Sequence, residues 1–262
     1  MNAFRPTAIP LMTTDPFFSI WSFADRLTDD SPRHWTGRRQ SMLGVLTVDG
    51  VPYRFMGQTD PFESYFADGP ALKQTSVTVN PTSTVYTFAH PLCDLTVTFL
   101  TPLLCDRPEV MSRSVSYVFY EIVPVEEGHT FEMYIDASCD LCGDEKGQSF
   151  VHHVENGHAW IGAAEQNVLN ESGDDVRIGW GYLHLVHPNA EVSTRNCRTA
   201  FFRKRVSQRT KDRIARETAD ELLSFRTFPL VSATSEKLSD VFVFAYDDVH
   251  SVEYFGKPAD AY

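Results

Sequence analysis

A two-residue alternation of apolar and polar side chains runs along the middle of this 262-residue chain and limits the folds that it can adopt. Between residues 76 and 101, valine, tyrosine, phenylalanine and leucine alternate with serine and threonine, and residues 115–119 and 131–135 continue the pattern. Successive side chains of a strand point to opposite faces, so this period is typical of strands with one buried face. The turn-forming sequences between the runs include Asn80-Pro81, His90-Pro91 and Pro124–Gly128. We therefore predict an all-β fold, an antiparallel β-sandwich.

One pair of runs carries a specific hairpin signal. Residues 150–154 and 158–163 are both rich in β-forming side chains, and Asn156-Gly157 lies between them. Asparagine followed by glycine suits the tight turns that join two antiparallel strands. We predict a β-hairpin here.

The first 65 residues differ from the rest of the chain. They are rich in aromatic and turn-forming residues and contain few clear alternating runs. Such a segment could wrap around a sandwich or line an interface. We expect residues 1–65 to form an irregular aromatic segment that packs on a sandwich domain of residues 66–244.

A second departure is a helical pattern over Gln208–Leu223, where apolar residues recur at intervals of three and four. We predict about one surface helix there. It overlaps the stretch Arg195–Arg216, which holds nine basic residues against one acidic residue. A solvated helix that pairs with the acidic remainder of the protein explains this stretch better than an RNA- or phosphate-binding face, because Phe201-Phe202 are the only aromatic residues within it.

Overall charge and cysteine content exclude several classes of protein. With 23 basic and 35 acidic residues the net charge is −12, which disfavours nonspecific nucleic-acid and anionic-membrane binding. No apolar run approaches the roughly 18 residues of a membrane span, and residues 1–15 lack the apolar core of a signal peptide. The five cysteines are few and odd in number, unlike a secreted disulfide framework. We expect a cytoplasmic protein with no nucleic-acid or membrane partner.

Familiar catalytic motifs, such as the P-loop and the G-x-S-x-G elbow, do not occur in the sequence. Cys139 and Cys142, followed by His152, His153 and His158, have a spacing that is reminiscent of zinc ligands. Adjacent histidines on a strand point to opposite faces, however, so His152 and His153 cannot both join one site. We expect neither a metal nor a cofactor.

Paired carboxylates occur at Asp29-Asp30, Asp174-Asp175 and Asp247-Asp248. General acid–base catalysis needs two carboxylates at a set distance and in different environments, which neighbours in sequence do not provide by themselves. Turn formation is the simpler explanation for each pair. Asp174-Asp175 stands out because an aromatic strand follows it.

Short motifs spread in order along nearly the whole chain. They are Arg5-Pro6, 9–11, 15–21, 34–37, 48–50, 71–74, 95–102, 112–117, 134–138, 173–178, 180–182, 245–248 and Tyr254-Phe255. In this order they resemble glutaminase A-like proteins. Gly179 departs from the pattern, which leads us to expect an acidic residue there.

The resemblance implies a short N-terminal segment, a supersandwich-like β-sandwich and then an α/α toroid of six helical hairpins, similar to glycosidase barrels. It implies hydrolysis of glutamine to glutamate and ammonia in the parent protein. The sequence stops at Tyr262, about where the toroid would begin. We therefore expect residues 245–262 to begin a linker, and the chain to be the N-terminal part of a longer parent. The toroid would be its partner in the same chain and would carry the catalysis, so this chain alone would be inactive and meet substrate only through the parent.

No catalytic residue can be assigned from the resemblance, but residues that buttress the toroid or rim its active site can be suggested. Aromatic side chains beside carboxylates suit either role, although a tryptophan can equally be buried core. The candidates are Trp21, Asp25, Trp35, Asp174, Asp175, Trp180 and Tyr182. A carbohydrate-binding or glycosidase-associated sandwich remains the alternative function, because exposed tryptophans stack well on sugar rings.

Overall fold

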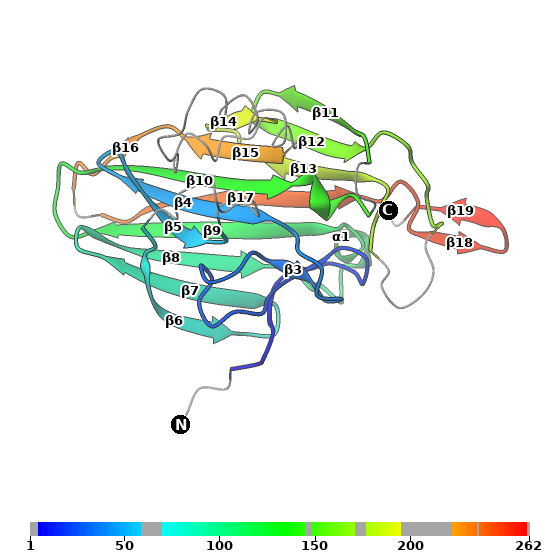
Figure 1. Cartoon of the computed structure of the whole chain (residues 1–262), viewed down its shortest axis with the longest axis horizontal. Coiled ribbons are helices and arrows are strands. Elements are labelled where there is room, and N and C mark those ends of the chain that lie inside the picture. The colour runs from blue at the N-terminus through cyan, green and yellow to red at the C-terminus, as the bar shows by residue number, and fades with distance from the viewer. Residues whose placement is uncertain are drawn as a thin grey trace, which may run out of the picture.

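Two large antiparallel sheets form the body of the protein (Figure 1). The computed structural model describes residues 5–58, 70–144, 148–170, 177–194, 222–234 and 236–260. The eight-stranded sheet has the order β11-β12-β13-β17-β9-β8-β7-β6. Its strands are β6 (Lys73–Val79), β7 (Ser83–His90), β8 (Cys93–Leu100), β9 (Val115–Pro124), β11 (Phe150–Glu155), β12 (His158–Ala163), β13 (Tyr182–Val186) and β17 (Leu238–Asp247).

The second sheet has the order β14-β15-β10-β4-β5, and a short strand, β16, also pairs with β10. Its strands are β4 (Met42–Val48), β5 (Val51–Met56), β10 (Thr130–Ser138), β14 (Ala190–Ser193), β15 (Leu222–Thr227) and β16 (Leu230–Val231). Ring contacts join the two sheets: Phe225 on β15 stacks on Phe242 of β17, and Phe55 on β5 meets Phe88 of β7. The prediction of an all-β antiparallel sandwich is confirmed.

The alternating runs form strands, and one face of each is buried between the sheets. In β8, Leu95, Val97 and Phe99 are at most 1% exposed, while the threonines between them are half-buried. The hairpin predicted around Asn156-Gly157 is also present, as β11 and β12. In β9 both faces carry apolar residues: Val118, Tyr120 and Ile122 point into the core, whereas Phe119 faces outward.

The N-terminal residues contain more strands than the sequence led us to expect. β1 (Ile9–Thr13), β2 (Ser19–Ser22) and β3 (Arg33–His34) form a small antiparallel sheet that meets β7, where Thr84 Oγ1 donates to the Pro10 carbonyl. β4 and β5 enter the second large sheet. All seven residues of β4 are buried. A strand buried on both faces shows a continuous apolar run instead of alternation, which is why β4 was missed.

The helix predicted over Gln208–Leu223 is wrong at its C-terminal end. Leu222 and Leu223 begin β15, where they pair with Ser138 and Ala137 of β10. The rest of this segment, with the basic stretch up to Arg216, lies outside the described residues. The described helical turns are α1 (Pro108–Met111) and the 3-10 turn η1 (Cys139–Leu141). No helix in the described ranges combines the length and the apolarity needed to span a bilayer.

A two-stranded hairpin, β18 (Val252–Tyr254) and β19 (Lys257–Ala259), projects from one end of the sandwich (Figure 1). Its turn residues Phe255 and Gly256 have φ of 49° and 72°. Glycine adopts this left-handed region freely, whereas a phenylalanine there is strained. Phe255 is also 88% exposed, although its ring lies 4.5 Å from that of its neighbour Tyr254.

Candidate functional site at one end of the sandwich

A cleft of about 590 Å³ opens where several strands end. Its walls come from residues 13–17 between β1 and β2, residues 80–84 at the β6–β7 turn, and residues 101–103 and 111–114 between β8 and β9. The cleft is completed by Ile178 and Trp180 before β13 and by Asp248 and Ser251 after β17. This volume is within the range of about 300–1,000 Å³ that is usual for small-molecule sites.

The floor of the cleft is apolar and includes Leu11, Phe17, Phe99 and Trp180. Trp180 is 2% exposed, and its ring lies 5.5 Å from that of Phe17. The carbonyl of Trp180 accepts a hydrogen bond from the Tyr246 hydroxyl, but its indole Nε1 has no hydrogen-bond partner in the described structure. A buried donor without a partner is costly and therefore unusual.

A glycine lets this segment approach the end of β17. Gly181, next to Trp180, has φ of 81°, and a Cβ atom at this position would collide with the carbonyl oxygen of Asp247. Only glycine combines the left-handed backbone with so close an approach. The Trp180 wall of the cleft therefore depends on Gly181.

Two carboxylates from distant parts of the sequence line the cleft. Asp15 Oδ1 accepts hydrogen bonds from the backbone nitrogens of Phe17 (2.7 Å) and Phe18 (2.8 Å). Burial, the largest effect, raises the pKa of Asp15 above its ordinary value. The two backbone hydrogen bonds oppose this rise, and the negative charge of Asp248 adds to it.

Arg113 and Ser251 add further polar groups to the walls. Arg113 lies on the exposed segment between α1 and β9. The Ser251 hydroxyl is buried without a hydrogen-bond partner in the described structure. The cleft thus combines two carboxylates and a guanidinium group around an apolar floor.

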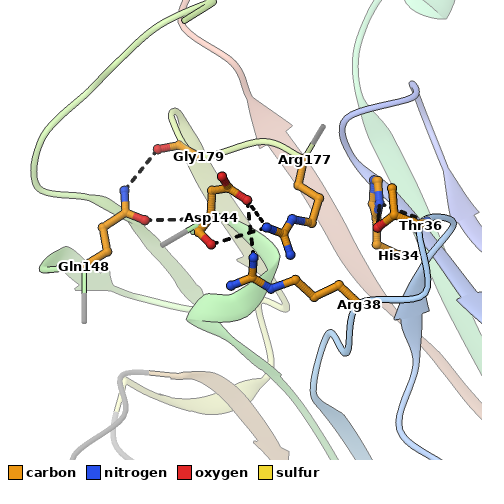
Figure 2. A network of polar contacts seen from close by, with 7 residues as sticks. All are labelled: His34, Thr36, Arg38, Asp144, Gln148, Arg177 and Gly179. Atoms are coloured by element: carbon orange, nitrogen blue, oxygen red, sulfur yellow. Dashed lines mark hydrogen bonds and ion pairs between the residues drawn. The ribbon is translucent and has the colours of Figure 1, made fainter. Parts of the chain in front are cut away.

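A polar network holds the segment that carries Trp180 (Figure 2). Arg177, whose side chain is 7% exposed, donates to the Asp144 carboxylate, and Arg38 Nη1 lies 3.4 Å from the same carboxylate. Gln148 joins the two sides: its Oε1 accepts from the Asp144 backbone nitrogen (3.1 Å), and its Nε2 donates to the Gly179 carbonyl (3.2 Å). These contacts fix residues 177–179 beside the cleft.

The turn after β3 is tied to the loop that contains Asp15. His34 is fully buried, with Nδ1 3.0 Å from Thr36 Oγ1 and Nε2 3.1 Å from the carbonyl oxygen of Pro16. Trp35 Nε1 donates to the same carbonyl at 2.7 Å, although its side chain is 48% exposed. The exposed indole is therefore held in one orientation close to the cleft loop.

The suggested interface or rim residues do not form one cluster. Trp180 is in the cleft wall but buried, and Trp35 is connected to the cleft through Pro16. Trp21 is half-buried on β2 and donates to Ser19, while Tyr182 lies on β13 with its ring 5.0 Å from that of Trp160.

Of the three suggested carboxylates, one is described. Asp25 is exposed and forms an ion pair of 2.8 Å with Arg5. Asp174 and Asp175 lie outside the described residues. The acidic residues that do line the cleft, Asp15 and Asp248, were not candidates. The Asp247-Asp248 pair and the Asp15-Pro16 turn were the only signals that pointed toward them.

The cysteines and histidines that resembled zinc ligands do not meet as a set. Among residues 5–58, 70–144, 148–170, 177–194, 222–234 and 236–260, no three histidine, cysteine or acidic side chains are grouped to hold a metal ion. Cys142 Sγ contacts the carbonyl of Cys139 at 3.5 Å, and His153 stacks on Trp160 of the neighbouring strand. These side chains contribute to local structure in η1 and the hairpin.

Two domain-family models match parts of the chain. Residues 82–262 match DUF5127, and residues 1–63 match DUF4964; both are described as domains of unknown function. Over 189 residues the chain is 26% identical to glutaminase A of Aspergillus oryzae (strain ATCC 42149 / RIB 40), a distant homology that covers 68% of this chain. The chain spans about a quarter (26%) of the length of this curated relative. Because the first match covers well over half of the residues, the chain belongs to the DUF5127 family.

Proposed function

We propose that this chain is the non-catalytic N-terminal β-sandwich module of a longer glutaminase-like amidohydrolase. The observation that carries the proposal is the extent of the homology, which covers 68% of this chain but 26% of glutaminase A. In the parent, a helical domain that follows the sandwich would hydrolyse glutamine. The sandwich would support that domain and rim its active site.

Exposed apolar side chains around the cleft support this arrangement. Leu103 and Met111 line the cleft and are 61% and 41% exposed. Phe255, 88% exposed, is at the tip of the hairpin that projects beyond the same end of the sandwich (Figure 1). Apolar groups gathered in this way are typical of surfaces that another domain covers. We assign this end to the contact with the helical domain.

Ammonia release from glutamine tests the division of labour. The 262-residue chain and the longer parent are assayed side by side at equal concentration. The proposal expects ammonia from the parent alone. Ammonia release by the 262-residue chain would contradict the non-catalytic role, and an inactive parent would contradict the glutaminase assignment.

A pair of phenylalanine substitutions tests the contact surface. Phe255→Ala should lower the melting temperature of the longer parent, because a buried phenylalanine contributes about 1.5–3 kcal/mol, and should leave the 262-residue chain unchanged. Phe228→Ala is the control: Phe228 is 63% exposed and follows β15 at the opposite end of the sandwich (Figure 1). Equal effects of the two substitutions in the parent would refute the assigned contact.

A carbohydrate-binding module is the second candidate function, and the exposed Trp35 favours it. Its indole N–H is anchored on Pro16, so one ring face is held ready for stacking. Titration with oligosaccharides such as cellobiose, with Trp35→Ala as the comparison, tests this function. Binding that Trp35→Ala abolishes would support it, and the absence of binding would exclude it for these sugars.

A further inference from the structure

β11 forms one edge of the eight-stranded sheet and lies at the top of the sandwich in Figure 1. Within the described part of the chain it pairs with β12 alone. Val151 and Val154, which point to opposite faces of the strand, are 41% and 43% exposed, so both faces are accessible. An edge strand presents a row of backbone groups to which another strand can bond. Sheet edges therefore usually carry features that block such pairing.

The other three edges of the two large sheets carry such features. β6 begins with Lys73 and has an irregular register with β7. β5 contains Pro52, and residues 70–72 bond to the backbone of Arg54 on its open side. β14 extends over only four residues. Lysine, proline, an irregular register and a short strand each hinder the addition of a further strand.

β11 has none of these features. Its six residues pair with β12 without a register shift. They include no lysine, arginine or proline, and Glu155 at the end is the one acidic residue. A regular edge of this composition accepts a further strand readily.

The hydrogen bonds to β12 show which backbone groups of β11 face the open side. The Ala164 nitrogen donates to the Ser149 carbonyl at 2.8 Å. Successive residues of an antiparallel strand direct their backbone groups to alternate sides, so Ser149 and every second residue after it face β12. Phe150, His152 and Val154 therefore direct their N–H and C=O groups toward the open side.

The side chains of β11 are complementary to a second, antiparallel copy of the same strand. With a two-fold axis at His152, Phe150 of each copy lies opposite Val154 of the other. A cross-strand pair of an aromatic and a β-branched side chain is favourable, and Glu155 does not face a second carboxylate in this register. An axis at His153 would lose the apolar pair. The register centred on His152 is therefore the more favourable one.

We propose that two copies of this chain associate through β11, in the antiparallel register centred on His152. The two eight-stranded sheets then form one continuous sheet across a symmetric dimer. Because a six-residue strand buries less surface than the roughly 1,600 Å² of a standard interface, the association is weak and depends on concentration. This interface does not depend on the glutaminase assignment proposed above.

Sedimentation velocity of the 262-residue chain, at about 10 μM to about 1 mM, tests the association. We expect a reversible equilibrium between monomer and dimer, with the dimer as the main species at the highest concentration. Amide hydrogen exchange at Phe150, His152 and Val154 should slow as the dimer forms, because their N–H groups become hydrogen-bonded. A chain that stays monomeric at about 1 mM would overturn the proposal, and so would a dimer in which exchange in β11 is not slowed.

The longer parent provides a second test of the same interface. It should also dimerise, with the same slowing of amide exchange in β11. A parent that stays monomeric at the concentrations at which the 262-residue chain dimerises would overturn the proposal, because it would show that another part of the parent covers this edge.

Charged substitutions of His152 test the register, because this residue lies opposite its own copy in the proposed dimer. His152→Glu and His152→Lys should each weaken self-association at least about tenfold, since each places like charges directly opposite each other. An equal mixture of the two variants should associate again, because glutamate then faces lysine.

Thr78→Glu is the matched control. Thr78 is exposed on β6, the other edge of the same sheet, so this variant should dimerise like the unmodified chain. Circular dichroism verifies that each variant is folded. The proposal would be refuted if both His152 variants associated like the unmodified chain, or if their mixture stayed monomeric.

Discussion

Replacing Tyr120 with phenylalanine should stabilise this protein, although removing a hydroxyl from a buried tyrosine usually destabilises. Tyr120 is on β9, is 1% exposed and packs against Phe242 of β17 at a ring distance of 5.5 Å. Its hydroxyl is buried without a hydrogen-bond partner among the described residues. Burial raises the pKa of this phenol, and the charge of Asp240 adds to the rise. The group therefore stays neutral but unsatisfied.

The expected increase in the free energy of unfolding follows from the cost of an unpartnered buried hydroxyl, which is about 1–3 kcal/mol. Phenylalanine keeps the ring and its packing, so Tyr120→Phe should raise the free energy of unfolding by at least about 1 kcal/mol. For a protein of this size that corresponds to about 2–4 °C in melting temperature. Urea unfolding followed by circular dichroism gives the free energy, and calorimetry gives the melting temperature.

Tyr134→Phe is the matched comparison. Tyr134 is also buried, but its hydroxyl donates to Asp136 Oδ2 at 2.8 Å. Removing this hydrogen bond to a charged group should cost about 1.5–3 kcal/mol. The two substitutions are chemically identical and should act in opposite directions. A loss of stability in both would refute the reasoning, because it would mean that Tyr120 also has a partner.

Three further substitutions test the cleft loop and two glycines. Asp15→Asn should stabilise the protein at neutral pH and much less at about pH 4, as measured by urea unfolding. The pKa of Asp15 is raised on folding, so its ionised form opposes folding above that pKa, and a neutral side chain removes the penalty. Gly57→Ala should cost at least about 2 kcal/mol, since φ is 75° and a Cβ would collide with the Met42 carbonyl. Gly37→Ala, where φ is 93° and nothing lies within 4 Å of the added Cβ, should cost about 1 kcal/mol. These arguments would be contradicted if Asp15→Asn changed the free energy of unfolding at neither pH. They would also be contradicted if Gly57→Ala and Gly37→Ala lowered that free energy equally.

The sequence was sufficient to predict a strand where only one of its faces is buried. β7 and β8 alternate because one face meets the second sheet and the other meets solvent. β4 was missed because both of its faces are buried and alternation is lost. Leu222 and Leu223 fit a helical period, but their pairing with β10 overrides that local preference. Local patterns therefore predict strands at the surface of the core more reliably than strands within it.

The cleft was less predictable because strand order, and not sequence spacing, brings its residues together. Asp15 follows β1 and Asp248 follows β17, and nothing local to either residue indicates that they line one cavity. Trp180 was singled out as an aromatic residue, but its burial depends on the close approach that Gly181 permits. Trp21 and Tyr182, also suggested as aromatic residues, and Asp25, suggested as a carboxylate, lie elsewhere.

The position of β17 has a consequence for synthesis on the ribosome. β6 to β9 pair in the order in which they are made, and so do β11 to β13. β17, made later than all of these, lies between β9 and β13 and joins the two groups. Until Leu238–Asp247 has left the ribosome, β9 and β13 each present an open edge, which is the kind of surface that promotes aggregation. Nascent chains in which β17 has not yet emerged from the ribosome should therefore be the species that most needs chaperones.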